Sequence, residues 1–126
     1  MIARILVVDD EEPVASMLKV VLESNGYTVV TASSAAAAVR VLSAEAFEVV
    51  LTDMKMESDS AGYEVVRAAR ALPEPPGVVI LTAYPLLAND WRAAGADAAM
   101  SKPSQMGLLL EVVDDLVQKR RNRTPQ

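Results

Sequence analysis

Short apolar runs alternate along the chain with longer segments whose apolar residues recur every three or four positions. Most of the runs are rich in Val, Ile and Leu, which predicts buried strands, and they lie at residues 4–8, 27–32, 47–52, 78–81 and 96–101. The periodic segments predict helices, and they lie at residues 13–24, 35–42, 63–72, 87–94 and 105–117. Strands that alternate with helices form parallel βαβ units. The pattern therefore predicts an α/β fold with helices on both faces of one sheet.

Residues at the ends of these segments predict where the helices begin and stop. Pro13 is expected to begin the first helix, because a residue in the first turn has no hydrogen-bond partner for its N–H within the helix and proline lacks that N–H. Gly26 is expected to end this helix as a cap in the left-handed conformation. Ser33 or Ser34 can cap the second helix. Residues 55–61 form the most polar and least periodic stretch, which predicts a loop directly after the third strand.

Polar side chains follow the apolar runs at the point where each strand ends. Asp9 and Asp10 follow the first strand, Asp53 follows the third, Thr82 ends the fourth and Lys102 follows the fifth. The carboxyl ends of parallel strands meet at one edge of a sheet. We therefore expect three carboxylates, a hydroxyl and an ammonium group to converge at an exposed edge.

These groups suit a site for a divalent cation and a phosphoryl group. Clustered carboxylates are the hard oxygen ligands that Mg²⁺ prefers, and three are too few to close its coordination shell, which leaves room for phosphate oxygens. Lys102 can pair with a phosphoryl group as a point charge. Simpler interpretations stay open: Asp9 and Asp10 as helix-capping residues, Asp53 as a turn residue, and Thr82 and Lys102 as ordinary strand-end residues.

Composition narrows the class of protein. The 126 residues are enough for one domain with its own core, and the absence of Cys and His excludes disulfides, thiolate or imidazole metal ligands and a phosphohistidine carried by this chain. The net charge of −5 argues against a nucleic-acid-binding domain. The sequence shows neither a membrane span nor a signal-peptide pattern, which predicts a cytoplasmic protein without a membrane partner. We expect one domain over residues 1–120 and a basic tail or linker start over residues 121–126.

Five short elements carry a resemblance to a known family. In chain order they are Val7-Val8-Asp9-Asp10-Glu11, Leu51-Thr52-Asp53-Met54, Leu81-Thr82-Ala83-Tyr84, Ala94-Gly95-Ala96-Asp97 and Ser101-Lys102-Pro103. Over essentially its whole length the chain resembles the CheY-like receiver domain of two-component response regulators. The resemblance implies a flavodoxin-like, doubly wound (βα)5 fold whose parallel strands have the order 2-1-3-4-5.

The resemblance also implies a function. Asp53 would accept a phosphoryl group from the phosphohistidine of a histidine kinase or phosphotransfer protein, Lys102 would pair with the phosphoryl oxygens, and Thr82 would be the switch hydroxyl. Mg²⁺ would be held by the carboxylates of Asp9, Asp10 and Asp53 and the backbone carbonyl of Lys55. The phosphorylated state would alter a surface that binds a downstream protein or a fused effector domain. Such a protein is a signalling switch rather than an enzyme, although it catalyses its own phosphorylation and slow dephosphorylation.

The chain departs from the family pattern at four places. Met100 stands where an aromatic residue often precedes the lysine by two positions, Glu57 stands where the loop usually carries Pro, and residues 58–62 are one residue longer than the common pattern. The segment between Thr82 and Lys102 is shorter than usual, which predicts a short fourth helix.

Three rival functions compete with this interpretation. The first is a receiver-like binding module that works without phosphorylation, which the presence of Asp53, Thr82 and Lys102 disfavours. The second is a haloacid-dehalogenase-like phosphatase, whose Asp-x-Asp pattern after the first strand is absent here. The third is a flavodoxin-like cofactor binder, which would need a phosphate-binding loop after the first strand.

Overall fold

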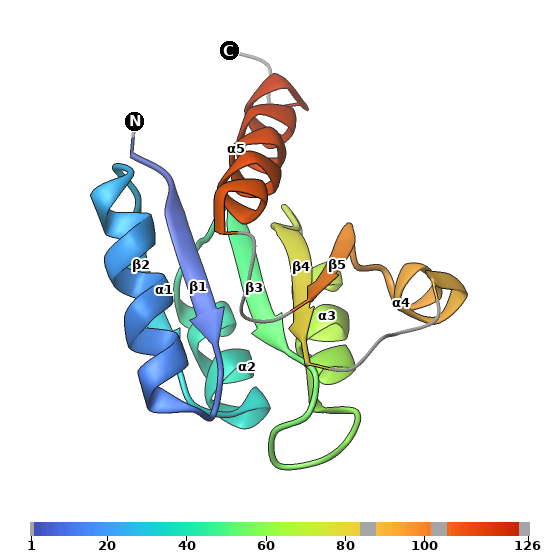
Figure 1. The fold of residues 1–126 in the computed structure, drawn as a ribbon. Coiled ribbons are helices and arrows are strands. Elements are labelled where there is room, and N and C mark those ends of the chain that lie inside the picture. Colours follow the sequence, from blue (N-terminus) through green and yellow to red (C-terminus); the bar gives the residue numbers. More distant parts are fainter. Residues whose placement is uncertain (1, 84–87, 102–105, 124–126) are drawn as a thin grey trace.

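Five parallel strands form one sheet in the order β2-β1-β3-β4-β5 in this computed structural model (Figure 1). The structure describes residues 2–83, 88–101 and 106–123. The strands are β1 (Arg4–Val8), β2 (Thr28–Ala32), β3 (Val49–Asp53), β4 (Gly77–Thr82) and β5 (Ala98–Ser101). The helices are α1 (Glu12–Ser24), α2 (Ala35–Ala44), α3 (Ala61–Arg70), α4 (Ala88–Ala94) and α5 (Met106–Arg123). The alternation and the strand order confirm the predicted doubly wound fold.

The bounds of most elements differ from those predicted by a few residues, and the differences at α1, α3 and β5 concern residues that were singled out in the sequence. Helix α1 begins at Glu12, one residue before Pro13. Helix α3 begins at Ala61, so that Gly62 lies in its first turn instead of preceding it. Strand β5 begins at Ala98, although the backbone of the preceding Asp97 already contacts β4, since its N–H donates a hydrogen bond of 2.8 Å to the Val78 carbonyl. The Asp97 carboxylate accepts a hydrogen bond of 2.8 Å from the N–H of Val78 in β4.

Two predicted cap residues occupy the expected conformations. Gly26 follows α1 with φ of 92°, the left-handed region that glycine adopts without a steric penalty. Ser34 is the N-cap of α2, and its hydroxyl accepts a hydrogen bond of 3.0 Å from the N–H of Ala37.

Helix α5 runs past the sheet to Arg123, three residues into the segment predicted to be a basic tail. The Arg120 side chain holds this end of the helix against the loop before β4, because its guanidinium donates hydrogen bonds to the carbonyls of Glu74 and Pro75.

No helix in the described part of the chain is long and apolar enough to cross a membrane. Helix α5 has 18 residues, but it carries too many charged side chains.

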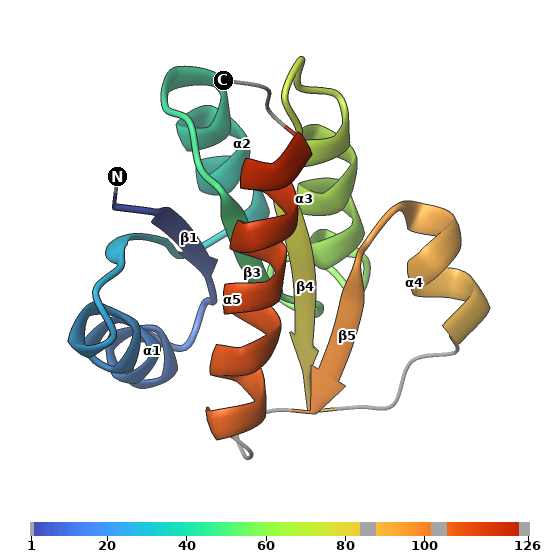
Figure 2. The ribbon, with the colours of Figure 1, turned by 90° about the horizontal axis from the view of Figure 1, so that it is seen from above.

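The helices cover the two faces of the sheet in two groups. Figure 2 shows α5 lying across one face, with α2 and α3 behind the other face and α4 beside β5. The buried residues of α1 and α5 pack on one face of the sheet, and those of α2 and α3 pack on the other. Each inner strand is therefore covered on both sides, which explains the nearly continuous apolar runs in β1, β3 and β4.

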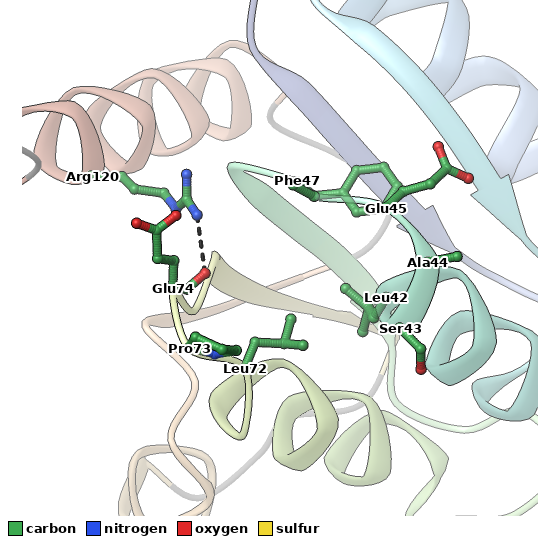
Figure 3. A pocket seen from close by; sticks show the side chains of 10 residues that line it. Leu42, Ser43, Ala44, Glu45, Phe47, Leu72, Pro73, Glu74 and Arg120 are labelled. Carbon is green, nitrogen blue, oxygen red and sulfur yellow. Dashed lines mark hydrogen bonds between the residues drawn. The ribbon is translucent and has the colours of Figure 1, made fainter.

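An open cavity of about 440 Å³ lies where the strands begin, at the amino-terminal edge of the sheet (Figure 3). It is lined by residues 42–47 at the end of α2 and just after it, by residues 72–74 after α3, and by Arg120 of α5. The carboxylates of Asp9 and Asp53 lie at the carboxyl ends of β1 and β3. This cavity is therefore at the opposite edge of the sheet from the polar residues of interest.

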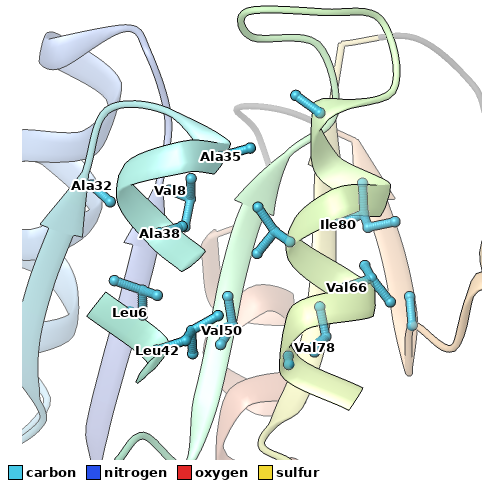
Figure 4. Packing of buried hydrophobic residues seen from close by; sticks show 14 of the residues in the cluster. Leu6, Val8, Ala32, Ala35, Ala38, Leu42, Val50, Val66, Val78 and Ile80 are labelled. Atoms are coloured by element: carbon cyan, nitrogen blue, oxygen red, sulfur yellow. The ribbon is translucent and has the colours of Figure 1, made fainter. Parts of the chain in front are cut away.

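The core between the sheet and helices α2 and α3 is built largely from Ala, Val and Ile side chains (Figure 4). Val50 and Ile80 from the sheet pack with Ala38 and Val66 from the two helices, and all four are fully buried. Small residues on the helices let the helix backbones approach the sheet closely. The ends of the strands are consequently held in fixed positions, which a site built on those ends requires.

Candidate functional site

The register of the sheet brings the predicted site residues to one edge. Val8 of β1 pairs with Thr52 of β3, so the next residues along, Asp9 and Asp53, leave two adjacent strands side by side. Asp53 pairs with Leu81 of β4, which places Thr82 one position further along the neighbouring strand. The edge in question is the lower one in Figure 1, where the strand arrowheads point.

Four carboxylates form a cluster at this edge. Each of Asp9, Asp10, Glu11 and Asp53 offers an oxygen, and these oxygens all lie within 4.8 Å of one another. Asp9 and Asp53 are buried, with exposed fractions of 3% and 8%, whereas Asp10 and Glu11 are exposed. The expectation that Asp53 lies at an exposed edge is therefore wrong. It is the last residue of β3 and is enclosed because the strand has neighbours on both sides.

Backbone N–H groups hold one oxygen of each buried carboxylate. The N–H of Met54 donates a hydrogen bond of 2.8 Å to Oδ1 of Asp53, and the N–H of Glu11 donates one of 2.8 Å to Oδ1 of Asp9. A carboxylate fixed through one oxygen presents its second oxygen in a set direction. The Thr52 hydroxyl adds a hydrogen bond of 2.8 Å to the Asp53 carbonyl, so the backbone that carries Asp53 is also held.

Gly62 lies against the backbone that follows Asp53. Its N–H donates a hydrogen bond of 2.8 Å to the Met54 carbonyl. A Cβ atom added at Gly62 would lie 2.6 Å from the Asp53 carbonyl oxygen and 2.8 Å from the Met54 Cα. Glycine at this position is thus required for α3 to begin so close to the end of β3.

The loop between β3 and α3 is fastened at a second point by Glu57. Its two carboxylate oxygens accept hydrogen bonds of 2.9 and 3.1 Å from the N–H groups of Ala35 and Ala36, the first residues of α2. The bond from Ala35 and a bond from the backbone of Glu57 itself hold the pKa of this carboxyl below its usual value. The favourable interaction of a carboxylate with a helix N-terminus acts in the same direction.

The donor set of the cluster fits a hard divalent cation. Carboxylate oxygens are the ligands that Mg²⁺ prefers, and Mg²⁺ keeps several water molecules or phosphate oxygens in its shell when few protein ligands are offered. Four like charges within 4.8 Å repel one another, and a bound cation would offset that repulsion. Asp9, Asp10 and Asp53 therefore lie together as a metal site requires. Lys55, whose carbonyl is the fourth predicted ligand, follows Asp53 by two residues in the exposed loop.

Of the other residues predicted for the site, the structure describes Thr82 but not Lys102. Thr82 is buried with an exposed fraction of 7% and ends β4, where it pairs with Ser101, the last residue of β5. Lys102 follows Ser101 in the sequence but lies outside the described residues, as do Pro103 and Tyr84. Met100 is half-buried and packs on the core beneath α5, consistent with core filling.

Two residues of this region were not predicted from the sequence. Glu11 belongs to the carboxylate cluster, and its position directly after Asp9 and Asp10 was a signal that could have indicated this role. Glu57 contacts α2 across a separation of 22 residues. The departure from the common Pro marked the position as unusual, but no pattern in the sequence pointed to its partners.

A shallow cavity of about 320 Å³ adjoins the cluster on the side of β2. It is lined by Asp9 and Asp10 together with Glu12 and Ala15 of α1 and residues 31–33 at the end of β2. The loop that leads into α2 therefore forms one wall beside the acidic residues, and the β3–α3 loop begins at Asp53 on the other side of them.

Comparisons with known proteins agree with this geometry. A family model described as the response regulator receiver domain matches residues 5–114. The transcriptional regulatory protein GlrR of Escherichia coli is 31% identical over 119 residues, which cover 93% of this chain and 27% of that protein. The chain therefore spans about a quarter of the length of this relative.

Two solved structures are similar over nearly the whole chain. A CheY-like receiver domain protein from Methanospirillum hungatei has a TM-score of 0.89 and 28% identity and covers 98% of this chain and 100% of its own. The response regulator TrrA from Thermotoga maritima, solved in complex with Mg²⁺-BeF, has a TM-score of 0.82 and 30% identity. The match covers 91% of this chain and 99% of TrrA. On the strength of its fold, its carboxylate cluster and the matching family model, the chain belongs to the response regulator receiver domain family.

Proposed function

We propose that this receiver domain is a phosphorylatable signalling switch in which Asp53 accepts the phosphoryl group. The observation that carries the proposal is the cluster itself: Asp53 is a buried carboxylate, held through one oxygen and surrounded by three further carboxylates that suit Mg²⁺. A structural neighbour of this chain has been solved with Mg²⁺-BeF. Family membership makes the same chemistry the natural interpretation of the site.

The side chains would act mainly by position and charge. The second oxygen of Asp53 would form a bond to phosphorus as the bond from phosphorus to the donor's imidazole nitrogen breaks, and the imidazole leaves with the electron pair. Asp9, Asp10, Asp53 and the Lys55 carbonyl would hold Mg²⁺, which when bound neutralises charge on the phosphoryl oxygens. Lys102 would pair with the same oxygens, and the Thr82 hydroxyl would donate to one of them in the phosphorylated state.

The partners follow from this chemistry. A histidine kinase or a phosphotransfer protein would supply the phosphoryl group, because this chain has no histidine of its own. Residues 1–120 would form the receiver unit, and residues 121–126, of which the first three continue α5, would form a tail or the start of a linker. The output would be a separate protein target or a fused effector domain. Uptake of phosphate from acetyl phosphate in the presence of Mg²⁺ separates this function from that of a phosphorylation-independent binding module.

Mg²⁺ is expected to stabilise the unphosphorylated protein through the carboxylate cluster. At a tenfold excess over its Kd the ion should add about 1.4 kcal/mol to the free energy of unfolding, or roughly 5 °C in Tm for a domain of this size. Asp10→Ala should remove this rise, whereas Glu23→Ala, which removes an exposed carboxylate of α1 outside the cluster, should retain it. Thermal unfolding with and without Mg²⁺ measures the effect. A full rise in Asp10→Ala would place the metal elsewhere.

Thr82 is expected to couple phosphorylation to β5. A phosphoryl group can shift a conformational equilibrium only through contacts that differ between the two states. Since Thr82 pairs with Ser101, Thr82→Ala should accept phosphate but lose the chemical-shift changes that phosphorylation causes over residues 98–101. The exposed Thr28 in β2 provides the control, Thr28→Ala. Unchanged shifts in Thr82→Ala relative to the wild type would show that the signal leaves the site by another route.

A further inference from the structure

Glu57 connects the phosphorylation site to the N-terminus of α2. The first helical N–H groups of any α-helix have no partner within the helix. In α2 those of Ala35 and Ala36 donate to the two oxygens of Glu57, at 2.9 and 3.1 Å, and that of Ala37 donates to the Ser34 hydroxyl at 3.0 Å. Two separate groups therefore share the capping of one helix, and only one of them comes from the loop after Asp53.

The loop between β3 and α3 has two anchors, and Lys55 lies between them. At its base the Met54 carbonyl accepts a hydrogen bond of 2.8 Å from the N–H of Gly62. At its tip the Glu57 carboxylate bonds α2. The backbone carbonyl of Lys55, an expected Mg²⁺ ligand, is one residue from the first anchor and two residues from the second. Loss of the second anchor would remove the two bonds that hold this exposed loop to α2.

Glu57 connects the two chain segments that lie on either side of the acidic cluster. The segment over residues 31–33, which leads into α2, lines the cavity beside Asp9 and Asp10. The β3–α3 loop starts at Asp53. The carboxylate of Glu57 spans from one segment to the other, so it fixes their separation as well as the shape of its own loop.

We propose that Glu57 is a positioning residue of the metal site: by bonding the N-terminus of α2 it holds the Lys55 carbonyl in place, so that Mg²⁺ affinity depends on Glu57. This inference rests on the proposed function, because it assumes that the cluster binds Mg²⁺. Groups that orient metal ligands without touching the metal commonly change metal affinity by about tenfold or more when they are removed. Coupling between two sites is reciprocal, so if Glu57 raises the affinity for Mg²⁺, bound Mg²⁺ should stabilise the bonds of Glu57 to the α2 N-terminus.

The experiment compares three alanine variants by Mg²⁺ titration calorimetry. Glu57→Ala removes the bonds between the loop and α2, and with them a helix cap and a negative charge. Ser34→Ala removes only a cap at the same helix N-terminus. Asp59→Ala removes only a carboxylate from the same exposed loop. Glu57→Ala is expected to raise the Mg²⁺ Kd by about tenfold. The other two should leave the Kd within about twofold of the wild type, although Ser34→Ala should lower the midpoint of urea unfolding, as the loss of an N-cap does.

A second variant and a second measurement guard against a folding defect. Glu57→Gln keeps the length of the side chain and one oxygen acceptor, so its Kd should lie between those of the wild type and Glu57→Ala. Hydrogen exchange adds a readout on α2: Mg²⁺ should slow exchange of the Ala35 and Ala36 amides in the wild type but have little effect on them in Glu57→Gln.

The possible outcomes separate this proposal from the proposed function. If the wild type binds Mg²⁺ and Glu57→Ala binds it equally well, Glu57 is only a helix cap and the inference is overturned while the function stands. Equal weakening by Asp59→Ala would assign the effect to net charge in the loop and would likewise overturn it. A wild type that does not bind Mg²⁺ would contradict the proposed function, and the inference with it.

Discussion

Asp53→Asn is expected to abolish phosphate uptake and to leave the fold intact. The amide nitrogen is a poor nucleophile and the amide oxygen carries no full charge, so no phosphorus bond should form at this position. The Oδ1 atom of asparagine can still accept the 2.8 Å hydrogen bond from the N–H of Met54. Replacing one carboxylate also relieves repulsion within the cluster, so Tm without Mg²⁺ should be equal to or higher than that of the wild type.

The matched control for this variant is Asp59→Asn, which makes the same chemical change in the loop that follows, at an exposed carboxylate outside the cluster. It should take up phosphate like the wild type. Intact-mass spectrometry after treatment with acetyl phosphate and Mg²⁺ reports uptake, and circular dichroism reports the fold. Undiminished phosphorylation of Asp53→Asn would assign the phosphoacceptor to another residue.

Gly62→Ala is expected to lower stability although alanine is the better helix former. Alanine should gain about 1 kcal/mol of helix propensity in α3. Its Cβ, however, would lie 2.6 Å from the Asp53 carbonyl oxygen and 2.8 Å from the Met54 Cα. Both are backbone atoms of a buried segment and cannot move aside as a flexible side chain would. Overpacking of this kind costs about 1–3 kcal/mol, so the net free energy of unfolding should fall and Tm should drop by several degrees.

Gly107→Ala is the control, because a Cβ at that position in α5 meets nothing within 4 Å. It should raise the free energy of unfolding by up to about 1 kcal/mol. Thermal and urea unfolding measure both variants. Because the displaced carbonyl belongs to Asp53, Gly62→Ala should also slow phosphorylation, while Gly107→Ala should not. Equal stabilisation by the two substitutions would contradict the close approach of α3 to β3.

The layout of the site could be predicted because parallel strands impose it. The apolar runs that end at Asp9, Asp53 and Thr82 were recognisable in the sequence, and any parallel sheet brings such ends to one edge. The register confirms this arrangement for these residues. Position along a strand does not fix burial, however. Asp53 was expected to be exposed, and it is buried because its neighbours across the sheet and the turn into α3 enclose it.

Contacts between segments far apart in the sequence could not be predicted. The bond from Glu57 to α2 depends on where two loops meet in space, and neither loop has a periodic pattern that reports the other. The start of α3 was misplaced for a similar reason. Gly62 looked like a residue before a helix, whereas its close contact with the Asp53 carbonyl is a feature of tertiary packing.

The central claim is that Asp53 takes up a phosphoryl group in a Mg²⁺-dependent reaction. The most direct measurement is mass spectrometry of the wild type after treatment with acetyl phosphate, with Mg²⁺ in one arm and a chelator in the other, followed by peptide mapping after borohydride reduction of the acyl phosphate. The account predicts a gain of one phosphoryl group in the Mg²⁺ arm only, mapped to Asp53. No gain in either arm, or a gain mapped to another residue, would contradict it.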